Sequence, residues 1–580
     1  MTALTDQRGA LVPASSRGRA RRPGGTRTRV PTLYRRMNMS ATLGRERPAM
    51  AAAPTGSAGT AALPGPAAAI VALVSGGLLV AAFPPHDRWW LAPVAVALLV
   101  LALRRRSARA GAGLGLLHGA AFFMPLLSWS GVYVGALPWL LLAGLQTCFL
   151  AVLGAVSPRV LTVRGWPLWW AGLWVAQEAL RGRIPFGGFP WGRLAFSQAG
   201  APTLGLAGVG GIPLVSGAVA FAGALLAAAA LAFLPEGQPG DPRRRRGPVA
   251  VLAWTAAAAV VTVSALVLPA ARPDGSPVTV AVVQGNVPQL GLGFNAQREA
   301  VLRNHVEATL ALARAVAAGR AEAPDLVIWP ENASDIDPVV NASAARLIDT
   351  AADAIAVPIL VGAILDGPGN LRSNAGIVWD PVTGPGERYL KRHPVPFAET
   401  VPLKALARRV SDKVDLVGRD VYAGTTVGAL AVGPAVLGDV ICYEVAYDGL
   451  VRDNVRDGAG ALVVQTNNAT FGLTGMSAQQ FAMSRLRAVE HGRWVLVAAT
   501  SGLSGIIAPD GSVRARSELF TDEVFVETIT QAAGGTLATR TGALAEAVLA
   551  GLGVLGLLAA LRATRGARSA AGHDRGEVSA

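Results

Sequence analysis

Residues 204–233 read LGLAGVGGIPLVSGAVAFAGALLAAAALAF, an apolar run that contains no charged residue. A helix that crosses the hydrocarbon core of a bilayer needs about 20 predominantly apolar residues. The run therefore predicts a membrane-spanning helix that is long enough to tilt or to kink. Seven other apolar segments of low charge predict further spans. They are Ala67–Phe83, Trp89–Leu103, Ala110–Trp129, Val134–Val156, Trp166–Leu180, Val249–Ala270 and Gly542–Leu561.

The composition of the whole chain agrees with a membrane protein. Of its 580 residues, 52% are hydrophobic and 15% are charged, whereas a soluble domain carries about 25% charged residues. The net charge is +15. The basic residues lie in the segments between the apolar runs rather than along one stripe, which favours a membrane protein over a nucleic-acid-binding protein. Two cysteines cannot form a disulfide framework, and the six histidines show no metal-binding spacing. We therefore expect no metal, no cofactor and no nucleic-acid partner.

The loop charges indicate how the chain is oriented. Arginine clusters occur at Arg104–Arg106, around Arg159, at Arg243–Arg246 and in both tails. With eight spans and a cytoplasmic N-terminus, every cluster falls on the cytoplasmic side of a cell membrane, as the positive-inside rule requires. Omission of one span would break this alternation. Glu178 and Arg181 lie near the outer end of the fifth span, where a functional role and snorkelling to the interface explain them equally well.

These boundaries predict five parts of the chain, the third of them outside the cytoplasm. They are a disordered basic tail (1–65), a membrane domain of seven helices (66–270), a folded extracytoplasmic domain (271–541), an eighth transmembrane helix (542–562) and a basic cytoplasmic tail (563–580).

The folded part, 271–541, alternates short apolar runs with amphipathic stretches. Strands alternating with helices predict a buried sheet that is covered by helices. The predicted strands are Val278–Val283, Leu326–Trp329, Ile359–Ile364, Gly376–Trp379, Val436–Tyr443, Ala461–Gln465, Trp494–Ala499 and Ile506–Ala508. The predicted helices are Gln297–Ala318, Ala342–Ala354 and Ser477–Glu490.

Three reactive residues lie at or after predicted strands. Glu331 ends the string LVIWPE, Lys391 lies in YLKRHPVPFAE, and Cys442 lies in GDVICYE. Open α/β folds bind their ligands where the chain leaves the sheet. Taken alone, each residue has a commoner structural explanation: a cysteine in an apolar run is usually a small core residue, and a lone glutamate or lysine in a loop is usually solvated.

The combination of these strings changes that balance. W-P-E, Y-x-K-x-H-x-V-P-F-x-E and C-Y-E, in this order, resemble the Glu-Lys-Cys triad of the nitrilase superfamily. Together with the eight predicted spans, the chain is similar to the apolipoprotein N-acyltransferases. Further strings agree with the resemblance: Gln284-Gly-Asn286, Thr466-Asn-Asn-Ala-Thr-Phe-Gly472, Arg485-x-Arg487-Ala-Val-Glu490 and Gly188-Phe-Pro-Trp191.

The resemblance implies a multi-span α-helical membrane domain joined to an α-β-β-α sandwich. It also implies a reaction that moves an acyl chain from a membrane phospholipid to the α-amino group of a diacylglyceryl-cysteine of apolipoproteins. The implied roles are nucleophile for Cys442, general base for Glu331 and oxyanion stabiliser for Lys391. Glu399 and Glu444 match further acidic positions of the family, and Tyr443 matches a supporting one.

A thioester must be shielded from water, so we expect apolar loops to open the site toward the bilayer. Phe397, Phe471 and Leu473 are candidates for that route, with ordinary core packing as the alternative for each. The family commonly has Trp where this chain has Thr470, which bears on acyl-chain preference. Two other functions stay open: a membrane-anchored amidohydrolase with the same triad, and a transporter or scaffold whose outer domain only binds.

Overall fold

The computed structural model describes residues 63–132, 135–233, 247–287, 297–410, 415 and 418–577. The expected disordered tail lies outside the described residues, except for its last three positions. The final residues of the predicted C-terminal tail, 578–580, also lie outside them.

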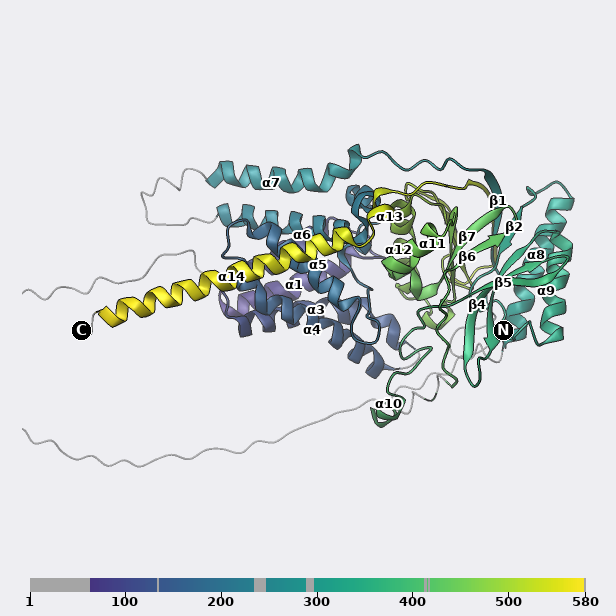
Figure 1. The fold of residues 1–580 in the computed structure, drawn as a ribbon, viewed down its shortest axis with the longest axis horizontal. Coiled ribbons are helices and arrows are strands. Elements are labelled where there is room, and N and C mark those ends of the chain that lie inside the picture. The colour runs from purple at the N-terminus through teal and green to yellow at the C-terminus, as the bar shows by residue number, and fades with distance from the viewer. Residues whose placement is uncertain are drawn as a thin grey trace, which may run out of the picture. The chain divides into compact units, whose positions relative to one another are not determined.

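Eight helices occupy the positions of the eight apolar segments. They are α1 (Gly65–Ala82), α2 (Leu91–Leu103), α3 (Ala108–Leu126), α4 (Ala136–Val160), α5 (Trp166–Arg181), α6 (Ala207–Phe233), α7 (Gly247–Val263) and α14 (Leu544–Glu577) (Figure 1). Five regions are long and apolar enough to cross a membrane: Gly65–Ala82, Ala136–Val160, Pro202–Phe233, Gly247–Val267 and Leu544–Arg565. Because α2, α3 and α5 are shorter or less apolar than this requirement, a count of eight spans stays a prediction.

The long apolar segment that includes α6 is kinked. Gly210 and Gly211 have non-helical backbone angles, with φ of +68° at Gly211, and Pro213 follows two residues later. A glycine pair beside a proline is a recognised cause of a sharp kink. A Cβ atom at Gly211 would lie 2.6 Å from Oε1 of Glu490, so the kink also brings the backbone of α6 against a side chain of the α/β domain.

The last helix differs from its predicted bounds at both ends. Gly542, with φ of +63°, follows the short helix α13 (Leu537–Thr541), and α14 begins at Leu544. At the other end α14 continues to Glu577, well past the predicted end at residue 562. Alanine and arginine are strong helix formers, so the polar sequence after Leu561 extends the helix. An apolar run predicts the length of a membrane span and not the end of its helix.

Two six-stranded sheets make up the centre of the α/β part. The first, in the order β12-β1-β2-β3-β4-β5, contains β1 (Pro277–Gln284), β2 (Leu326–Ile328), β3 (Ile359–Asp366), β4 (Arg372–Asp380), β5 (Gly384–Leu390) and β12 (Glu523–Thr530). The second, in the order β11-β10-β9-β8-β7-β6, contains β6 (Ala429–Val432), β7 (Ala435–Ile441), β8 (Ala461–Thr466), β9 (Val495–Ala499), β10 (Gly505–Ile507) and β11 (Val513–Arg516). In each sheet three adjacent strands are parallel: β1, β2 and β3 in one, and β7, β8 and β9 in the other.

The layers confirm the expected α-β-β-α sandwich. Val280 and Ile328 of the first sheet share one core with Leu437 and Val463 of the second. The outer face of the first sheet packs on α8 (Arg298–Ala317) and α9 (Ala342–Ile355) (Figure 1). On the second sheet lie α11 (Asp448–Arg456) and α12 (Met476–His491), which share a continuous hydrophobic core with the apolar helices α1 to α6. One outer layer of the sandwich is therefore covered by the helical part of the chain.

All eight predicted strands overlap an observed strand, and all three predicted helices are confirmed. The strands that the sequence did not predict are β5, β6, β11 and β12. Strand β5 reads GPGERYL and β11 reads VRAR, so neither has the continuous apolar run by which buried strands are recognised. Tertiary pairing with β4 and β10 holds these segments as strands.

Candidate active site

Glu331 lies just beyond β2, at the point where Pro330 ends the strand. Its carboxylate is buried, with 4% of the residue exposed. The backbone N–H of Asn467 donates to Oε2 at 2.8 Å, and the Thr500 hydroxyl donates to the Glu331 carbonyl at 2.9 Å. A Cβ atom at Gly362 of β3 would lie 2.1 Å from the Pro330 carbonyl oxygen. Only glycine at that position lets the neighbouring strand approach so closely.

The Lys391 ammonium joins two carboxylates. It follows β5 and is 1% exposed, and its Nζ lies 3.0 Å from Oε1 of Glu331 and 2.8 Å from Oε2 of Glu399. The Asn374 amide donates to both acids, at 2.7 Å to Glu331 and 3.1 Å to Glu399. The backbone N–H of Val395 donates to Glu399 at 2.7 Å. The structure thus brings Glu331, Lys391 and Glu399 together.

The two neighbouring carboxylates determine the protonation state of Lys391. Burial works against the ammonium form, but the carboxylates of Glu331 and Glu399 hold the pKa of Lys391 well above its usual range. Lys391 is therefore a cation. Two carboxylates and one ammonium leave one uncompensated negative charge beside the cysteine. That excess disfavours a second anion at the same place.

Cys442 begins the turn that follows β7. Its φ of +55° lies in the left-handed region that non-glycine residues rarely adopt, and the residue is 7% exposed. Burial and the Glu331 charge raise the pKa of the thiol to about 12, although Lys391 and a hydrogen bond with Thr466 act in the opposite direction. The resting group is a neutral thiol. A base is needed to convert a thiol with this pKa to the thiolate near neutral pH.

The carboxylate of Glu444 contacts the backbone at this turn and in the loop that follows Lys391. Its carboxylate accepts hydrogen bonds from the backbone N–H groups of Ile441, Arg392 and His393 at 2.7–2.9 Å, and from the Tyr389 hydroxyl at 2.9 Å. Burial raises the pKa of Glu444 even so. One acid therefore joins the end of β7 to the loop that follows Lys391. Glu444 lies two residues after Cys442 in the sequence.

Tyr443 joins the same turn to the helical part of the chain. Its hydroxyl donates to the Gly188 carbonyl at 3.3 Å, and its ring stacks at 6.2 Å between centroids on Trp191. The Trp191 indole N–H donates at 2.7 Å to Gln479 of α12. The string Gly188-Phe-Pro-Trp191, which lies after α5, is therefore in direct contact with the turn that holds Cys442.

The three aromatic and aliphatic candidates for a lipid route are placed differently. Phe397 is 51% exposed and its ring meets that of Phe186 edge-on at 5.6 Å. Leu473 is 74% exposed. Phe471 is half-buried and meets Trp129 edge-on at 5.2 Å. Two of the three are exposed apolar side chains on loops, and the third packs against a residue beyond α3.

A second group of buried charges fastens α12 and α5 together, and we call it the junction cluster. Arg193 lies 3.5 Å from Glu178 and 2.7 Å from Asp448. Arg487 lies 2.8 Å from Asp448, pairs also with Glu490, and donates at 2.8 Å to the Val445 carbonyl in the turn that begins at Cys442. With Arg181, whose guanidinium caps the Phe189 and Trp191 carbonyls, the cluster comprises Glu178, Arg181, Arg193, Asp448, Arg487 and Glu490.

This arrangement resolves one alternative left by the sequence. Snorkelling to the interface would leave the charged ends of Glu178 and Arg181 in contact with water. Glu178 is 2% exposed and Arg181 is 1% exposed, so both are held inside the fold. The Glu178 carboxylate accepts hydrogen bonds from the Trp174 indole N–H and the Leu194 backbone N–H, both at 2.9 Å.

The sequence did not predict Asn374 or the backbone N–H of Asn467 as parts of the site. Asn374 is the third residue of β4, and an asparagine in a strand carries no recognisable signal for a contact with two distant carboxylates. Among the residues that the structure describes, no three His, Cys, Asp or Glu side chains are grouped so that they could hold a metal ion.

Family models and known proteins match most of this chain. The model described as apolipoprotein N-acyltransferase N-terminal domain matches residues 75–225, and that of carbon-nitrogen hydrolase matches residues 279–538. The apolipoprotein N-acyltransferase of Mycolicibacterium smegmatis is 45% identical over 508 residues, which are 84% of each chain. That of Azotobacter vinelandii is 32% identical and covers 87% of this chain and 96% of its own. A nitrilase-superfamily amidase structure from Nesterenkonia covers 46% of this chain and 95% of its own, with 16% identity and a TM-score of 0.35.

The matches to the two apolipoprotein N-acyltransferases extend over more than four fifths of either partner. They run through both the helical part and the sandwich, and the two family models divide the chain in the same way. The chain belongs to the apolipoprotein N-acyltransferase family.

Proposed function

We propose that this chain transfers an acyl chain from a membrane phospholipid to the N-terminal α-amino group of the diacylglyceryl-cysteine of apolipoproteins, through a thioester on Cys442. The observation that carries the proposal is the Lys391 ammonium, which bridges Glu331 and Glu399 beside a buried cysteine. Membership of the family supplies the class of acceptor.

In the first half-reaction, Glu331 takes the thiol proton as the Cys442 sulfur attacks the ester carbonyl carbon of the phospholipid. The new C–S bond leaves a negative oxygen, which the Lys391 ammonium and the backbone N–H of Tyr443 stabilise. One such donor contributes about 3–4 kcal/mol to the transition state. The C–O bond then breaks, and the lysophospholipid oxygen receives the proton from Glu331. The excess negative charge around Lys391 suits a base that must accept a proton in this step.

In the second half-reaction, the amine of the acceptor attacks the thioester carbonyl. Glu331 accepts the proton that the nitrogen loses, the C–S bond breaks, and Glu331 then gives this proton to the sulfur, which returns to the thiol form. No step consumes ATP, since the acyl group is already esterified in the lipid. The covalent intermediate divides one slow exchange into two easier ones.

Water competes with the amine for the thioester, so the site must be supplied from the membrane side. We infer that Phe397, Phe471 and Leu473 line the route of the acyl chain, because two of them are exposed apolar side chains and the third contacts Trp129. We also propose that the sandwich lies on the extracytoplasmic face of the cell membrane, with both termini in the cytoplasm. The arginine clusters in the loops support this orientation.

Mass spectrometry of the purified full chain with phospholipid tests the proposal. We expect an increase by the mass of one acyl group on the peptide that holds Cys442, absent in Cys442→Ser and retained in Cys148→Ala. A diacylglyceryl peptide should discharge the adduct and become acylated at its α-amino group. Discharge by water alone would instead identify the membrane-anchored amidohydrolase, and a chain that forms no adduct would fit a binding protein.

A further inference from the structure

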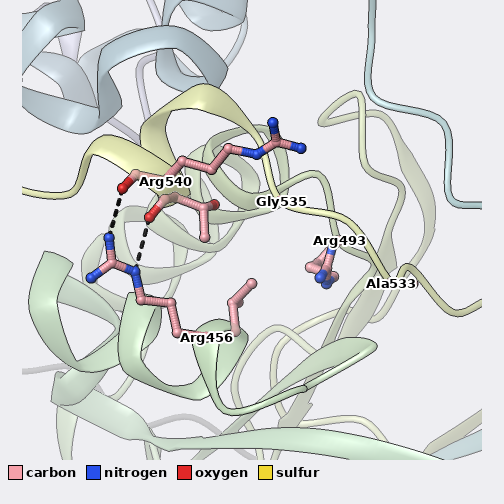
Figure 2. Close-up of a pocket in the computed structure, with 7 residues that line it drawn as sticks. Arg456, Arg493, Ala533, Gly535 and Arg540 are labelled. Carbon is pink, nitrogen blue, oxygen red and sulfur yellow. Dashed lines mark hydrogen bonds between the residues drawn. The ribbon is translucent and has the colours of Figure 1, made fainter.

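A cavity of about 360 Å³ lies between α11 and α13, in a part of the sandwich that the proposed mechanism does not use. Arg456, Arg493 and Arg540 line it, and no acidic residue does. Figure 2 shows these three arginines around the cavity, with Gly535 and Ala533 on the connecting loop. A cavity of this size is large enough for a small ligand or a headgroup.

The guanidinium groups retain hydrogen-bond donors that no described residue uses. Arg456 donates through Nε to the Thr539 carbonyl at 3.1 Å and through Nη2 to the Arg540 carbonyl at 2.9 Å. Arg493 donates through Nε and Nη1 to backbone carbonyls, among them Ala459 at 2.9 Å. The second terminal nitrogen of each remains, and the exposed Arg540 guanidinium has no partner in the described part of the chain.

One acid, Asp274, lies at the edge of this cavity, and a second, Glu546, is engaged elsewhere. Asp274 acts electrostatically on Arg493, yet burial lowers the pKa of Arg493 overall, and the Asp274 carboxylate accepts a hydrogen bond from the Ala533 backbone N–H at 3.2 Å. Glu546, in the first turn of α14, pairs with Arg183. The cavity is therefore a concentration of positive charge, which fits an anion. Arginine forks match the oxygens of phosphate in particular.

The position of the cavity indicates where that anion comes from. Arg540 lies in α13, four residues before Leu544, the first residue of α14. Leu537 and Leu544, on either side of it in sequence, are 54% and 58% exposed. Exposed leucines beside an arginine are typical of a surface that lies at the level of the lipid headgroups. We propose that this cavity binds the phosphate group of an anionic phospholipid, as a site separate from the acyl donor's, and this rests on the proposed insertion of α14 in the membrane.

The arginine-lined cavity is separated from Cys442, the residue proposed to form the thioester. Helix α11 runs from Asp448, close after the turn Cys442–Ala446, to Arg456 at the cavity. Nine residues of helix extend about 13 Å, so a headgroup held at Arg456 does not place its ester on the Cys442 sulfur. Bound lipid would instead hold the C-terminal end of α11, and with it the sandwich, against the membrane surface.

Lipid titration of the full chain in neutral maltoside detergent tests the proposal. All proteins carry Cys442→Ala, so that no acyl transfer occurs, and tryptophan fluorescence reports binding. The probes are dioctanoyl phosphatidylglycerol, dioctanoylglycerol with the same chains and no phosphate, and inorganic phosphate. We expect Arg540→Gln to weaken phosphatidylglycerol binding about tenfold, the usual scale for loss of one hydrogen bond to a charged group. Arg540→Glu should weaken it further and Arg540→Lys should retain most of it.

Arg320→Glu is the matched control, because Arg320 is an exposed arginine beyond α8 that does not line the cavity. Binding that Arg540→Glu leaves unchanged would overturn the proposal, as would an equal loss for dioctanoylglycerol. If inorganic phosphate competes with phosphatidylglycerol, the cavity also accepts the free ion. If it does not compete, the cavity binds phosphate only as part of a lipid. Failure of the proposed acyl transfer is seen separately, as a missing adduct on Cys442.

Discussion

Two groups of buried charges flank the turn that begins at Cys442, and they differ in their balance. Around Lys391, two carboxylates share one ammonium. In the junction cluster, three carboxylates meet three guanidinium groups, and Asp448 is paired with both Arg193 and Arg487. The balanced group is typical of a fastening between elements, whereas the unbalanced one leaves a carboxylate that can take up a proton. We therefore expect the two groups of buried charges to differ in role: the group around Lys391 in proton transfer, and the junction cluster in stability.

Removal of the proposed base should have the largest effect. Glu331→Gln leaves Lys391 paired with Glu399 and removes the excess negative charge. We expect the rate of acyl-enzyme formation to fall by about 10²–10⁴-fold, the usual contribution of general acid–base catalysis. Quenched-flow mass spectrometry of the Cys442 adduct measures this rate. Glu307→Gln, at an exposed glutamate of α8, is the matched control and should keep the wild-type rate.

The pH dependence of thiol alkylation tests whether the excess negative charge around Lys391 raises the pKa of Cys442. With a pKa of about 12, the Cys442 thiolate fraction rises about tenfold for each pH unit, so alkylation by iodoacetamide in a Cys148→Ala background should rise about a thousandfold from pH 7 to pH 10. No plateau is expected in this range. In Glu331→Gln, loss of one negative charge should lower the pKa of the thiol. A plateau below pH 9 in the parent protein would reveal a thiolate already formed beside Lys391.

The junction cluster should respond through stability. Arg487→Met leaves Glu490 without its arginine partner, Asp448 with Arg193 alone, and the Val445 carbonyl without its donor. Loss of one partner of a buried pair costs about 3–5 kcal/mol of unfolding free energy. We expect a clearly lower midpoint of thermal unfolding in detergent, together with slower acylation of Cys442. A variant with unchanged stability would mean that the balanced cluster does not fasten the two parts.

The smallest effect is expected for a surface pair on the opposite layer. Arg303 and Glu299 of α8 lie 2.6 Å apart with side chains 54% and 62% exposed. Solvent screens such a pair, and its contribution is about 0.3–0.5 kcal/mol. Arg303→Met should therefore shift the unfolding midpoint only marginally, measured beside Arg487→Met. A shift for Arg303→Met as large as that for Arg487→Met would mean that buried and exposed charge pairs do not differ in their contribution to stability.

The strands of the sandwich could be predicted because they depend on local signals, whereas the roles of the reactive residues stay a prediction. Apolar runs mark the buried parallel strands, and Pro330 marks the point where the chain leaves β2 for Glu331. Family strings then linked Glu331, Lys391 and Cys442, although they lie about 50–60 residues apart. The contact between Lys391 and Glu399 falls within one string, which made both of its residues candidates.

Long-range polar contacts could not be predicted in this way. Arg193 and Asp448 are 255 residues apart, and nothing local in either position indicates the other. Asn374 reaches the site from the interior of a strand, and the edge strand β5 is too polar for recognition. The eight helices followed from hydropathy, but the end of α14 did not, since helix propensity continues beyond the apolar segment.

The left-handed backbone at Cys442 has a consequence for the evolution of the chain. A side chain with φ of +55° is strained by about 1–3 kcal/mol, and glycine would relieve that strain. We expect Cys442→Gly to melt at a higher temperature than Cys442→Ala. Selection for a robust fold alone would have favoured glycine at this position. The proposed nucleophile thus occupies a position where stability alone would favour a residue without a side chain.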